Sequence, residues 1–497
     1  MTPSGLPKRA LLALLPVLVL ASAAAARAAH ITPVRLASQA GPDLSTLQGP
    51  ALLPDGRFAV LLRTGDGSGY DADTTTFLQY VDVDGRLALQ RPGVVVSTSP
   101  SGGSQTTLVA HPHDGVFVAV RRVLDGESSR ISVQWFDGQG RPRWGAGRLA
   151  APVVAAESQS EPYLVASPDG GVSVCFVGGG QAFAGAVYCQ RFSPEGRRLW
   201  GRRGARTGPS SSFVELPKAL AAADGGLFVF WSDAGPPGGP ENRTYVRGQR
   251  LGPDGDQRWG DGARIVTENR LPDPIAFQLP WVEAVSDGIG GAIVACDDWV
   301  GPIPEGVDTN HVTVRRISAD GEDLWGEGVS VMPSRPPHVL YSLVASPDGG
   351  AFVGVGQMPF SIDEFWIHIA FQRLDADGRL LWPAGGVRLT KPRSVTGWDF
   401  EEPRAAFDGQ VLRVAWEHEM VDTRTWARSS EILFTAFDAA GNRLTDRESI
   451  AFTDAREYTA LGGFALDPGT GTSLVVWRGR DPGAGYYAEG VVYTPPP

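Results

Sequence analysis

The segment that decides the fold is Phe371–Thr390, FQRLDADGRLLWPAGGVRLT. It joins an apolar run, an Asp-x-x-Gly turn and a tryptophan that follows the turn glycine by four residues. Turns that align with this one recur along the chain at intervals of 55 to 66 residues. Their glycines are Gly85, Gly140, Gly196, Gly255, Gly321, Gly378 and Gly441. A period of this length predicts a repeat architecture, in which each unit completes its core only against its neighbours.

A tryptophan accompanies the turn in five of the seven copies. The first copy has Leu89 at this place and the last has Thr445. Because one unit cannot bury both of its faces, we expect the tryptophans to be structural and to pack between units. They are Trp144, Trp200, Trp259, Trp325 and Trp382.

Each copy is expected to form four short strands. The first strand ends at a DGG turn and the second follows at once, as in Asp348–Val355. Asp-Gly and Gly-Gly pairs favour hairpin turns, because these turns need a positive φ. The third strand precedes the Asp-x-x-Gly turn, and the fourth is expected to hold the tryptophan. Four antiparallel strands in a unit of about 40–60 residues are typical of a β-propeller blade, so the fold class is all-β, a single closed propeller.

The two ends of the chain complement one another. Residues His30–Ser38 resemble only the end of a unit, and Gly462–Tyr493 resembles only its first three strands. We expect the N-terminal strand to close the ring, which removes exposed sheet edges. This arrangement gives eight blades; seven is the alternative if the first unit, without its tryptophan, is irregular. The units are expected near residues 48–102, 103–158, 159–213, 214–278, 279–339, 340–398, 399–458, and 459–497 closed by 30–38.

Residues 1–28 have the features of an export signal. A basic start precedes the apolar segment Ala10–Leu20, and Ala26–Ala28 offers a small-x-small cleavage site. A transmembrane anchor is the alternative, but the apolar segment is short and contains Pro16. We therefore expect a propeller domain over residues 29–497 that acts in the periplasm, at the cell surface or outside the cell. Once the signal is removed, no membrane span is expected.

Three cysteines occur in the chain. Cys175 and Cys189 lie symmetrically about residue 182, so a hairpin centred there would place them opposite each other. In an oxidising compartment they could form a disulfide; two buried free thiols are the alternative. Cys296 follows the apolar run of a second strand and is expected in the core. No metal-binding spacing involves these cysteines.

The connections between the second and third strands should carry the function. These connections vary from 8 to 14 residues, whereas the DGG and Asp-x-x-Gly turns hardly vary. The variable connections should all emerge on one face, opposite the tight turns. They hold 17 Asp or Glu against 9 Lys or Arg. An acidic face disfavours nucleic acid and suits a cation, a basic protein surface or a carbohydrate. The alternative is that the solvated loops of an acidic protein, of net charge −11, are acidic without a role. A monomer is expected.

Two sets of carboxylates in these connections are candidate sites. Neighbouring blades could bring the first set together near the axis, as a glycosidase or a metal site would need. The second set could supply oxygen ligands to a calcium ion, although its spacing does not match an EF-hand. A solvated acidic rim is the alternative for both sets. The first set is Asp297, Asp298, Glu305, Asp308, Asp363 and Glu364, and the second is Asp66, Asp71 and Asp73.

No catalytic set is predicted. The chain lacks the metalloprotease, nucleophile-elbow and phosphate-loop motifs. Glu417-His418-Glu419 could suggest an acid–base cluster, but consecutive residues of a strand point to opposite faces. At most one carboxylate should therefore lie beside His418. No cofactor is predicted other than the possible calcium ion.

The segment Asp375–Trp382 resembles the tryptophan-docking repeat of quinoprotein-type eight-bladed propellers, whose copies usually have one more residue between Asp and Gly. The resemblance extends as a repeat pattern over most of residues 29–497 and implies the eight-bladed fold. Quinoprotein dehydrogenases use a pyrroloquinoline cofactor, a calcium ion, an Asp base and often a vicinal cysteine pair. This chain has no adjacent cysteines, and none of its residues maps onto the base or the calcium ligands. The pattern is also similar to exported bacterial propellers with the same Asp-Gly and Trp-Gly repeat.

Two functional interpretations follow. The favoured one is a non-catalytic binding or scaffold propeller that acts through the acidic, variable loops of one face. The alternative is a secreted carbohydrate-active or cofactor-dependent enzyme with a site at the axial mouth of that face. An enzyme should bring two carboxylates, or a carboxylate with Arg or His, within about 10 Å at the mouth. A binding protein needs only a broad rim.

Overall fold

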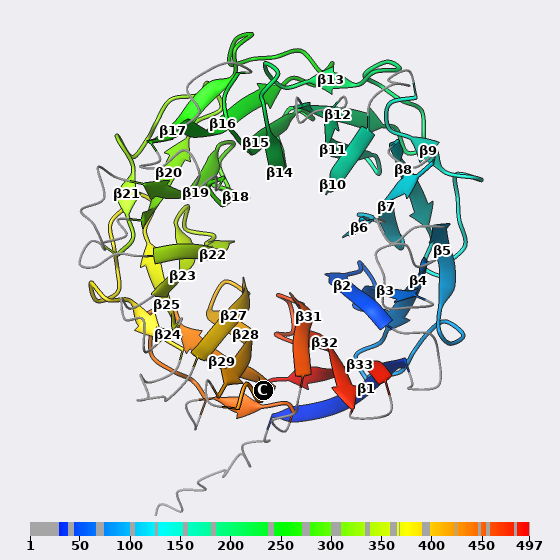
Figure 1. The fold of residues 1–497 in the computed structure, drawn as a ribbon, viewed down its shortest axis with the longest axis vertical. Helices are drawn as coiled ribbons and strands as arrows, with labels where there is room; N and C mark the ends of the chain where they lie inside the picture. The colour runs from blue at the N-terminus through cyan, green and yellow to red at the C-terminus, as the bar shows by residue number, and fades with distance from the viewer. Residues whose placement is uncertain are drawn as a thin grey trace, which may run out of the picture.

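The computed structural model of the protein is a ring of eight small sheets around a central axis (Figure 1). The described residues form strands and turns and contain no helix, which confirms the predicted eight-bladed, all-β propeller. The structure describes residues 29–37, 44–65, 74–99, 105–124, 128–152, 158–179, 185–236, 243–270, 279–299, 310–332, 338–357, 365–366, 368–389, 398–422, 425–445, 449–453, 458–481 and 485–496.

In each blade the strands follow one another outward from the axis (Figure 1). Blade 1 contains β2 (Leu44–Leu52), β3 (Phe58–Gly65), β4 (Thr74–Val81) and β5 (Val94–Ser99). Blade 2 contains β6 (Thr106–Ala110), β7 (Val116–Val123), β8 (Ser129–Phe136) and β9 (Arg148–Leu149). Blade 3 contains β10 (Ser158–Ala166), β11 (Val172–Gly179), β12 (Gly185–Phe192) and β13 (Ala205–Arg206). Blade 4 contains β14 (Val214–Ala221), β15 (Leu227–Asp233), β16 (Arg243–Leu251) and β17 (Arg264–Arg270).

The second half of the ring has the same plan. Blade 5 contains β18 (Val282–Ser286), β19 (Ala292–Trp299), β20 (Asn310–Ile317) and β21 (Val329–Ser330). Blade 6 contains β22 (His338–Ala345), β23 (Ala351–Gln357), β25 (His368–Leu374) and β26 (Val387–Arg388). Blade 7 contains β27 (Trp398–Phe407), β28 (Val411–Val421), β29 (Arg428–Asp438) and β30 (Ile450–Ala451), with β24 (Phe365–Trp366) added in parallel to β27. Blade 8 contains β31 (Tyr458–Leu466), β32 (Ser473–Asp481), β33 (Gly485–Thr494) and β1 (His30–Ala37).

The ring closes through the N-terminal strand. β1 is the outer strand of blade 8 and pairs antiparallel with β33, from His30 opposite Thr494 to Ala37 opposite Ala488. This confirms the predicted closure. The first unit forms a regular four-stranded blade although it lacks the tryptophan, so the seven-bladed alternative is wrong.

The second strand of each blade is covered on both sides by neighbouring blades. All seven residues of β15 are buried, and so are seven of the eight residues of β11. A strand covered on both faces is a continuous apolar run rather than an alternating one. This explains why the sequence after each DGG turn is so uniformly apolar.

The repeated tryptophans link neighbouring blades. Each indole N–H donates a hydrogen bond to a backbone carbonyl in the equivalent glycine turn of the following blade. Each indole also covers the turn glycine there: a Cβ at Gly196 would lie 2.9 Å from Trp144. The bonds run from Trp144 to Pro194 (2.9 Å), Trp200 to Pro253 (2.8 Å), Trp259 to Ala319 (3.0 Å), Trp325 to Ala376 (2.9 Å) and Trp382 to Ala439 (3.1 Å).

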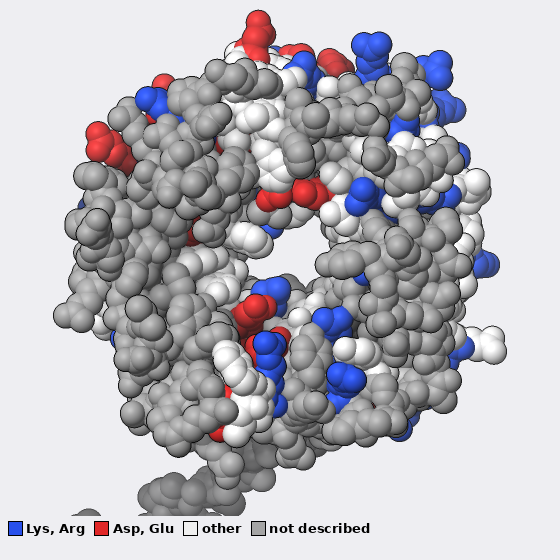
Figure 2. All heavy atoms as spheres, viewed as in Figure 1, with Lys and Arg blue, Asp and Glu red and all other residues white. Residues whose placement is uncertain are grey.

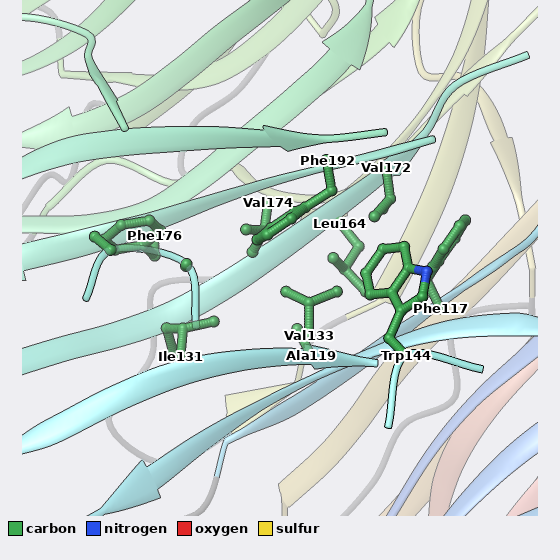
Figure 3. Packing of buried hydrophobic residues seen from close by; sticks show 12 residues of the cluster. Phe117, Ala119, Ile131, Val133, Trp144, Leu164, Val172, Val174, Phe176 and Phe192 are labelled. Atoms are coloured by element: carbon green, nitrogen blue, oxygen red, sulfur yellow. The ribbon is translucent and has the colours of Figure 1, made fainter. Parts of the chain in front are cut away.

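The expected place of the tryptophans within the blade is wrong in one detail. They lie in the turn before the fourth strand rather than in that strand, which is often only two residues long. This turn is the part of the blade that reaches the next one. Figure 3 shows Trp144 of blade 2 beside Phe117 and Phe192, in a cluster that joins blades 2 and 3. In blade 1, Leu89 takes the indole's place, 3.0 Å from where a Cβ would stand on Gly140.

In blades 2, 3, 4 and 6, a glutamine ten residues before the tryptophan holds this turn in place. In blade 2, Gln134 Oε1 accepts from the backbone N–H groups of Trp135 (3.0 Å) and Trp144 (2.9 Å), and Nε2 donates to the Gly145 carbonyl (2.7 Å). The repeat described from the sequence does not include this residue, although its constant spacing from the tryptophan is a signal that could have revealed it. The equivalent glutamines are Gln79, Gln190, Gln249 and Gln372.

Cys175 and Cys189 lie directly opposite each other on β11 and β12. Their sulfur atoms are joined in a disulfide. Of the two alternatives, the structure therefore contains the disulfide and not two free thiols. Cys296 is a free, fully buried thiol in the core between blades 4 and 5, as its place in the repeat led us to expect.

The tight turns emerge on one face of the ring. Both the DGG turns and the Asp-x-x-Gly turns are closed by short backbone hydrogen bonds, such as Gly349 N to Ser346 O (3.0 Å) and Gly378 N to Asp375 O (3.0 Å). The second strands end at the opposite face, where the connections to the third strands begin. We call this opposite side the long-connection face.

Candidate functional site

One position near the end of the second strands recurs in all eight blades, as its pairing with the third strands shows. We call its residues the second-strand ring. In blades 1 to 8 they are Arg63, Arg121, Val177, Ser232, Asp297, Gly356, Glu417 and Arg478. The ring lies close to the long-connection face, and five of its eight residues are charged.

Polar side chains of this ring reach the inner strand of the following blade. Asp297 Oδ1 accepts the backbone N–H of Leu340 (2.9 Å). Glu417 Oε2 accepts the backbone N–H of Leu461 (3.0 Å). In both inner strands the register shifts at this residue, which frees an N–H for a side-chain partner. The two carboxylates therefore occupy equivalent sites in blades 5 and 7.

Charge in the second-strand ring is unevenly distributed. Arg478, Arg63 and Arg121 stand on three consecutive blades, 8, 1 and 2. Glu417 is in blade 7, directly before this basic arc. Figure 2 shows an opening at the centre of the ring, with acidic and basic side chains side by side below it, over the region of β27 and β31 in Figure 1.

Glu417 faces a second carboxylate. It lies directly opposite Glu402 of the inner strand β27. Residues paired in this way have their Cβ atoms about 4.5–5.5 Å apart on the same side of the sheet. Glu402 is exposed, whereas Glu417 is half-buried. Burial, together with the negative charges of Glu402 and Glu419, raises the pKa of Glu417 to about 7, against the opposing effects of the Leu461 N–H and of Arg478.

Arg478 connects this acidic pair to blade 1. Its positive charge acts on Glu417 on one side and on Arg63 on the other. Burial and the charge of Arg478 together lower the pKa of Arg63. Both arginine side chains are half-buried.

Tyr341 of β22 extends the cluster towards blade 5. Burial and the charges of Glu402 and Asp297 raise the pKa of Tyr341 to about 12, so its phenol lies within the field of both carboxylates. Asp297 is buried, and this burial raises its pKa to about 7. The resulting set, which we call the rim cluster, consists of Asp297, Tyr341, Glu402, Glu417, Arg478 and Arg63.

The predicted site residues are only partly brought together. Asp298 lies on the other side of β19 from Asp297 and accepts a hydrogen bond from Thr313 Oγ1 (3.2 Å). The structure therefore separates these two neighbours instead of joining them, because successive strand residues face opposite sides. Seven further candidates lie outside the described residues: Glu305, Asp308, Asp363, Glu364, Asp66, Asp71 and Asp73.

His418 behaves as the alternation of strand residues led us to expect. Its Nδ1 lies 3.2 Å from Glu431 Oε1 on β29, on the side of β28 away from Glu417. Within the part of the chain that the structure describes, no group of three or more His, Cys, Asp or Glu side chains is arranged to hold a metal ion.

Glu402, Arg63 and Arg478 are absent from the residues predicted from sequence. A signal for two of them exists. Each second strand is an apolar run, and in several blades its last apolar residue is followed at once by a charge, as in Leu62-Arg63 and Trp477-Arg478. Glu402 could not have been found in this way, because its importance comes from its partner across the sheet.

A second set of charges crosses blades 3 to 5. Lys218 Nζ of β14 lies 2.8 Å from Glu283 Oε1 of β18 and 5.7 Å from the ring centroid of Tyr163 in β10. The cation is therefore satisfied by a carboxylate and an aromatic face, as in a structural link between inner strands.

No family model and no curated protein matches the chain. Among solved structures, the β-propeller domain of the trilobed protease from Pyrococcus furiosus is similar at 13% identity, with 82% of this chain and 97% of that chain covered and a TM-score of 0.38. An α-L-arabinanase from Penicillium chrysogenum is similar at 14% identity, with 70% and 96% covered and a TM-score of 0.35. Drosophila plexin A is similar at 10% identity, with 79% and 85% covered and a TM-score of 0.39. Similarity at this level does not extend to function.

Among the described residues, we find no helix of the length and apolar character needed to cross a membrane.

Proposed function

We propose that this chain is an exported binding protein that holds a polar ligand at the inner rim of its long-connection face. The observation that carries the proposal is the rim cluster, in which Glu417 of blade 7 lies opposite Glu402 and within the field of Arg478 of blade 8. Binding sites on propellers gain precision when their side chains stand on strands rather than on loops.

The electrostatics of the rim cluster support a role in binding. Glu417 is half-buried opposite a second carboxylate, and Arg63 is half-buried near a second guanidinium. Burial of such charges has a desolvation cost, and strongly perturbed groups gather at functional sites. The structural alternative is a network of ion pairs between blades, which would need no ligand.

The proposal of export has its support in the disulfide. Cys175 and Cys189 are joined in β11 and β12. Such bonds persist in oxidising compartments and are rare in the cytosol. The basic and apolar character of residues 1–28 points the same way.

The binding proposal is tested with two rim variants and a matched control. Glu402→Gln and Glu417→Gln remove the acidic pair, while Asp84→Asn removes an exposed carboxylate from a tight turn on the opposite face. The purified proteins are screened against a glycan array and a set of basic peptides. We expect a ligand that binds the wild type and Asp84→Asn and binds the rim variants at least tenfold more weakly. A ligand that binds all four proteins equally would place the site elsewhere.

A carbohydrate-active enzyme is the second candidate, and the Glu402–Glu417 pair favours it. Two carboxyl groups in contrasting environments, one exposed and one half-buried with its pKa raised to about 7, suit the roles of base or nucleophile and of acid. Together with the adjacent Arg478, the pair is the kind of cluster, two carboxylates beside an arginine, that an enzyme would need at the axial mouth. This alternative would be established if the wild type hydrolyses aryl glycosides and Glu417→Gln hydrolyses them at least 100-fold more slowly while it still binds the ligand. Binding without any turnover would leave the non-catalytic role.

A further inference from the structure

We infer that the tight turn between β6 and β7 is an acid-sensitive switch: neutral His111 holds this turn closed and against blade 3, and protonation of His111 opens it. The turn comprises residues 111–115 and lies on the face of the ring opposite the rim cluster. The inference is therefore independent of the proposed function and of its ligand.

The first step is the hydrogen bonding of the imidazole. His111 Nδ1 accepts from the backbone N–H groups of His113 (3.1 Å) and Asp114 (3.0 Å). Because Nδ1 is the acceptor of both bonds, the proton of the neutral ring is on Nε2. Nε2 lies beside Gly170 of blade 3, 3.7 Å from the place that a Cβ would take there. One ring thus closes the turn of its own blade and contacts the equivalent turn of the next blade.

The second step is a comparison with the same turn in blade 7. There an aspartate begins the turn, and Asp408 Oδ1 accepts from the backbone N–H groups of Gln410 (2.9 Å) and Val411 (2.7 Å). A carboxylate keeps its acceptor oxygens in neutral and mildly acidic solution, whereas an imidazole gains a proton in this range. His111 therefore has the bonding role of an aspartate and a different response to acid.

The third step is the effect of a proton on Nδ1. This proton would point at the N–H groups of His113 and Asp114, so both hydrogen bonds would be lost. Turning the ring over would not restore them, because a carbon atom would then face the two donors. His111 is only 4% exposed and is stacked on Trp135, with ring centroids 4.5 Å apart and planes at 8°, so the imidazolium could reach water only by leaving this stack.

Opening of the turn would also affect its neighbours. The Asp114 carbonyl accepts from Trp135 Nε1 (2.9 Å), and Asp114 Oδ1 accepts from the backbone N–H of Gly138 (2.8 Å) in the next tight turn of the blade. The turn thus connects the two tight turns of blade 2 with each other and, through His111, with Gly170 of blade 3. Protonation would weaken all of these contacts together.

The direction of the pH effect follows from the surroundings of the ring. Burial, followed by the charge of His113, lowers the pKa of His111, against the opposing effects of Asp114 and the Gly170 backbone. Between this lowered value and the ordinary value of about 6.5, the open turn binds more protons than the closed turn. The closed turn is therefore fully stable above this range and loses stability as pH falls through it.

The other charged groups on the elements packed against the turn have partners of their own. Arg143 lies over the ring of Trp135, 5.6 Å from its centroid. Apart from Asp114, the neighbouring carboxylates bind other side chains and are not left to compensate an imidazolium. These pairs are Asp137 with Arg141 (2.8 Å), Asp169 with Arg191 (2.9 Å) and Glu195 with Ser193 (2.8 Å).

Hydrogen exchange followed by mass spectrometry tests the switch between about pH 7.5 and about pH 5, with rates corrected for the intrinsic effect of pH. In the wild type, we expect the peptide that covers residues 111–117 to lose protection by roughly tenfold or more on acidification. The turn held by Asp408 is the internal control and should keep its protection. His111→Asp retains an acceptor over this range, so its turn should stay protected in acid. His113→Gln is the matched control and should still lose protection, because it keeps the imidazole of His111.

Two outcomes would overturn the inference. The first is a wild-type turn at residues 111–117 that keeps its protection in acid as well as the blade 7 turn does. The second is a His111→Asp protein whose turn loses protection in acid to the same extent as the wild type. If His111→Asp does not fold, the comparison of the blade 2 and blade 7 turns within the wild type decides, because both are measured in the same molecule.

Discussion

At the scale of the residue, the repeat is maintained by a few side chains that act across blade boundaries. The indole of Trp382 is buried, donates to the Ala439 carbonyl of the next blade and packs against Phe352 and Phe437. Gln372 holds the backbone of Trp382 from within its own blade. These contacts connect local turn geometry to the packing of the whole ring.

Replacement of Trp382 should therefore be costly. Trp382→Ala removes the indole from the interface between blades 6 and 7, and we expect the free energy of unfolding to fall by about 3–5 kcal/mol. Urea denaturation followed by intrinsic fluorescence measures the change. Trp426→Ala is the control, because that side chain is 62% exposed, and it should change stability by less than about 0.5 kcal/mol. Equal effects of the two substitutions would contradict a role of Trp382 in blade packing.

Asp297 should make stability depend on pH. Burial raises its pKa in the folded protein to about 7, whereas in the unfolded chain it should titrate near 4. Between these two values the folded state binds more protons than the unfolded state, so its contribution to stability falls as pH rises from about 4 to about 7. Asp297→Asn cannot ionise and keeps an oxygen for the Leu340 N–H. It should be more stable than the wild type at pH 8, by on the order of a few kcal/mol, and this advantage should shrink towards pH 5.

Thermal melts of the wild type and Asp297→Asn from pH 5 to pH 8 check this expectation. Asp84→Asn, in an exposed turn, is the control and should follow the wild-type profile. Parallel profiles for the wild type and Asp297→Asn would mean that the carboxylate is ionised in the folded protein throughout this range.

At the scale of the element, the inner strands decide how closely the blades approach. β31 and β2 come together where Gly463 faces Gly49, and no side-chain atom fits between the two backbones. This contact joins the last blade to the first. Glycine is needed here because another backbone occupies the place of its Cβ.

The contact between β31 and β2 can be tested by the addition of a single methyl group. Gly463→Ala would place a Cβ against the Gly49 carbonyl oxygen, and overpacking of this kind should lower stability by about 1–3 kcal/mol. Gly262→Ala is the control, because a Cβ there would meet no atom within 4 Å. Circular dichroism melts compare the two. If Gly463→Ala melts at the wild-type temperature, the backbones of β31 and β2 are not in contact at Gly463 and Gly49.

At the scale of the whole molecule, the ring is held closed by a single terminal strand. β1 pairs along its length with β33 and buries Val34 and Leu36 in the core between blades 8 and 1. Without β1, the outer edge of β33 would be open to pairing with another chain. Closure thus affects both stability and the oligomeric state.

Deletion of residues 1–37 tests this closure. We expect the shortened protein to melt at a lower temperature and to form dimers or larger assemblies through β33, as seen by size-exclusion chromatography with light scattering. A synthetic peptide of residues 29–38 should restore the monomer when it is added in excess. A deletion variant that stays monomeric with an unchanged melting temperature would show that β1 is not needed for closure.

The sequence by itself determined the architecture, because the features that define a blade are local. Tight Asp-Gly turns, apolar second strands and a tryptophan at constant spacing all lie within one unit, and their repetition leaves few folds open. The complementary ends, residues 30–38 and Gly462–Tyr493, could likewise be matched as two parts of one blade.

The rim cluster, in contrast, was decided by the tertiary structure alone. Glu402 and Glu417 are 15 residues apart, and Arg63 and Arg478 stand near the two ends of the chain. No spacing in the sequence relates them, because their proximity depends on strand register, on the order of the blades and on closure of the ring. Asp297 and Asp298 illustrate the same point: they are adjacent in the sequence, yet the strand between their side chains keeps them on opposite sides.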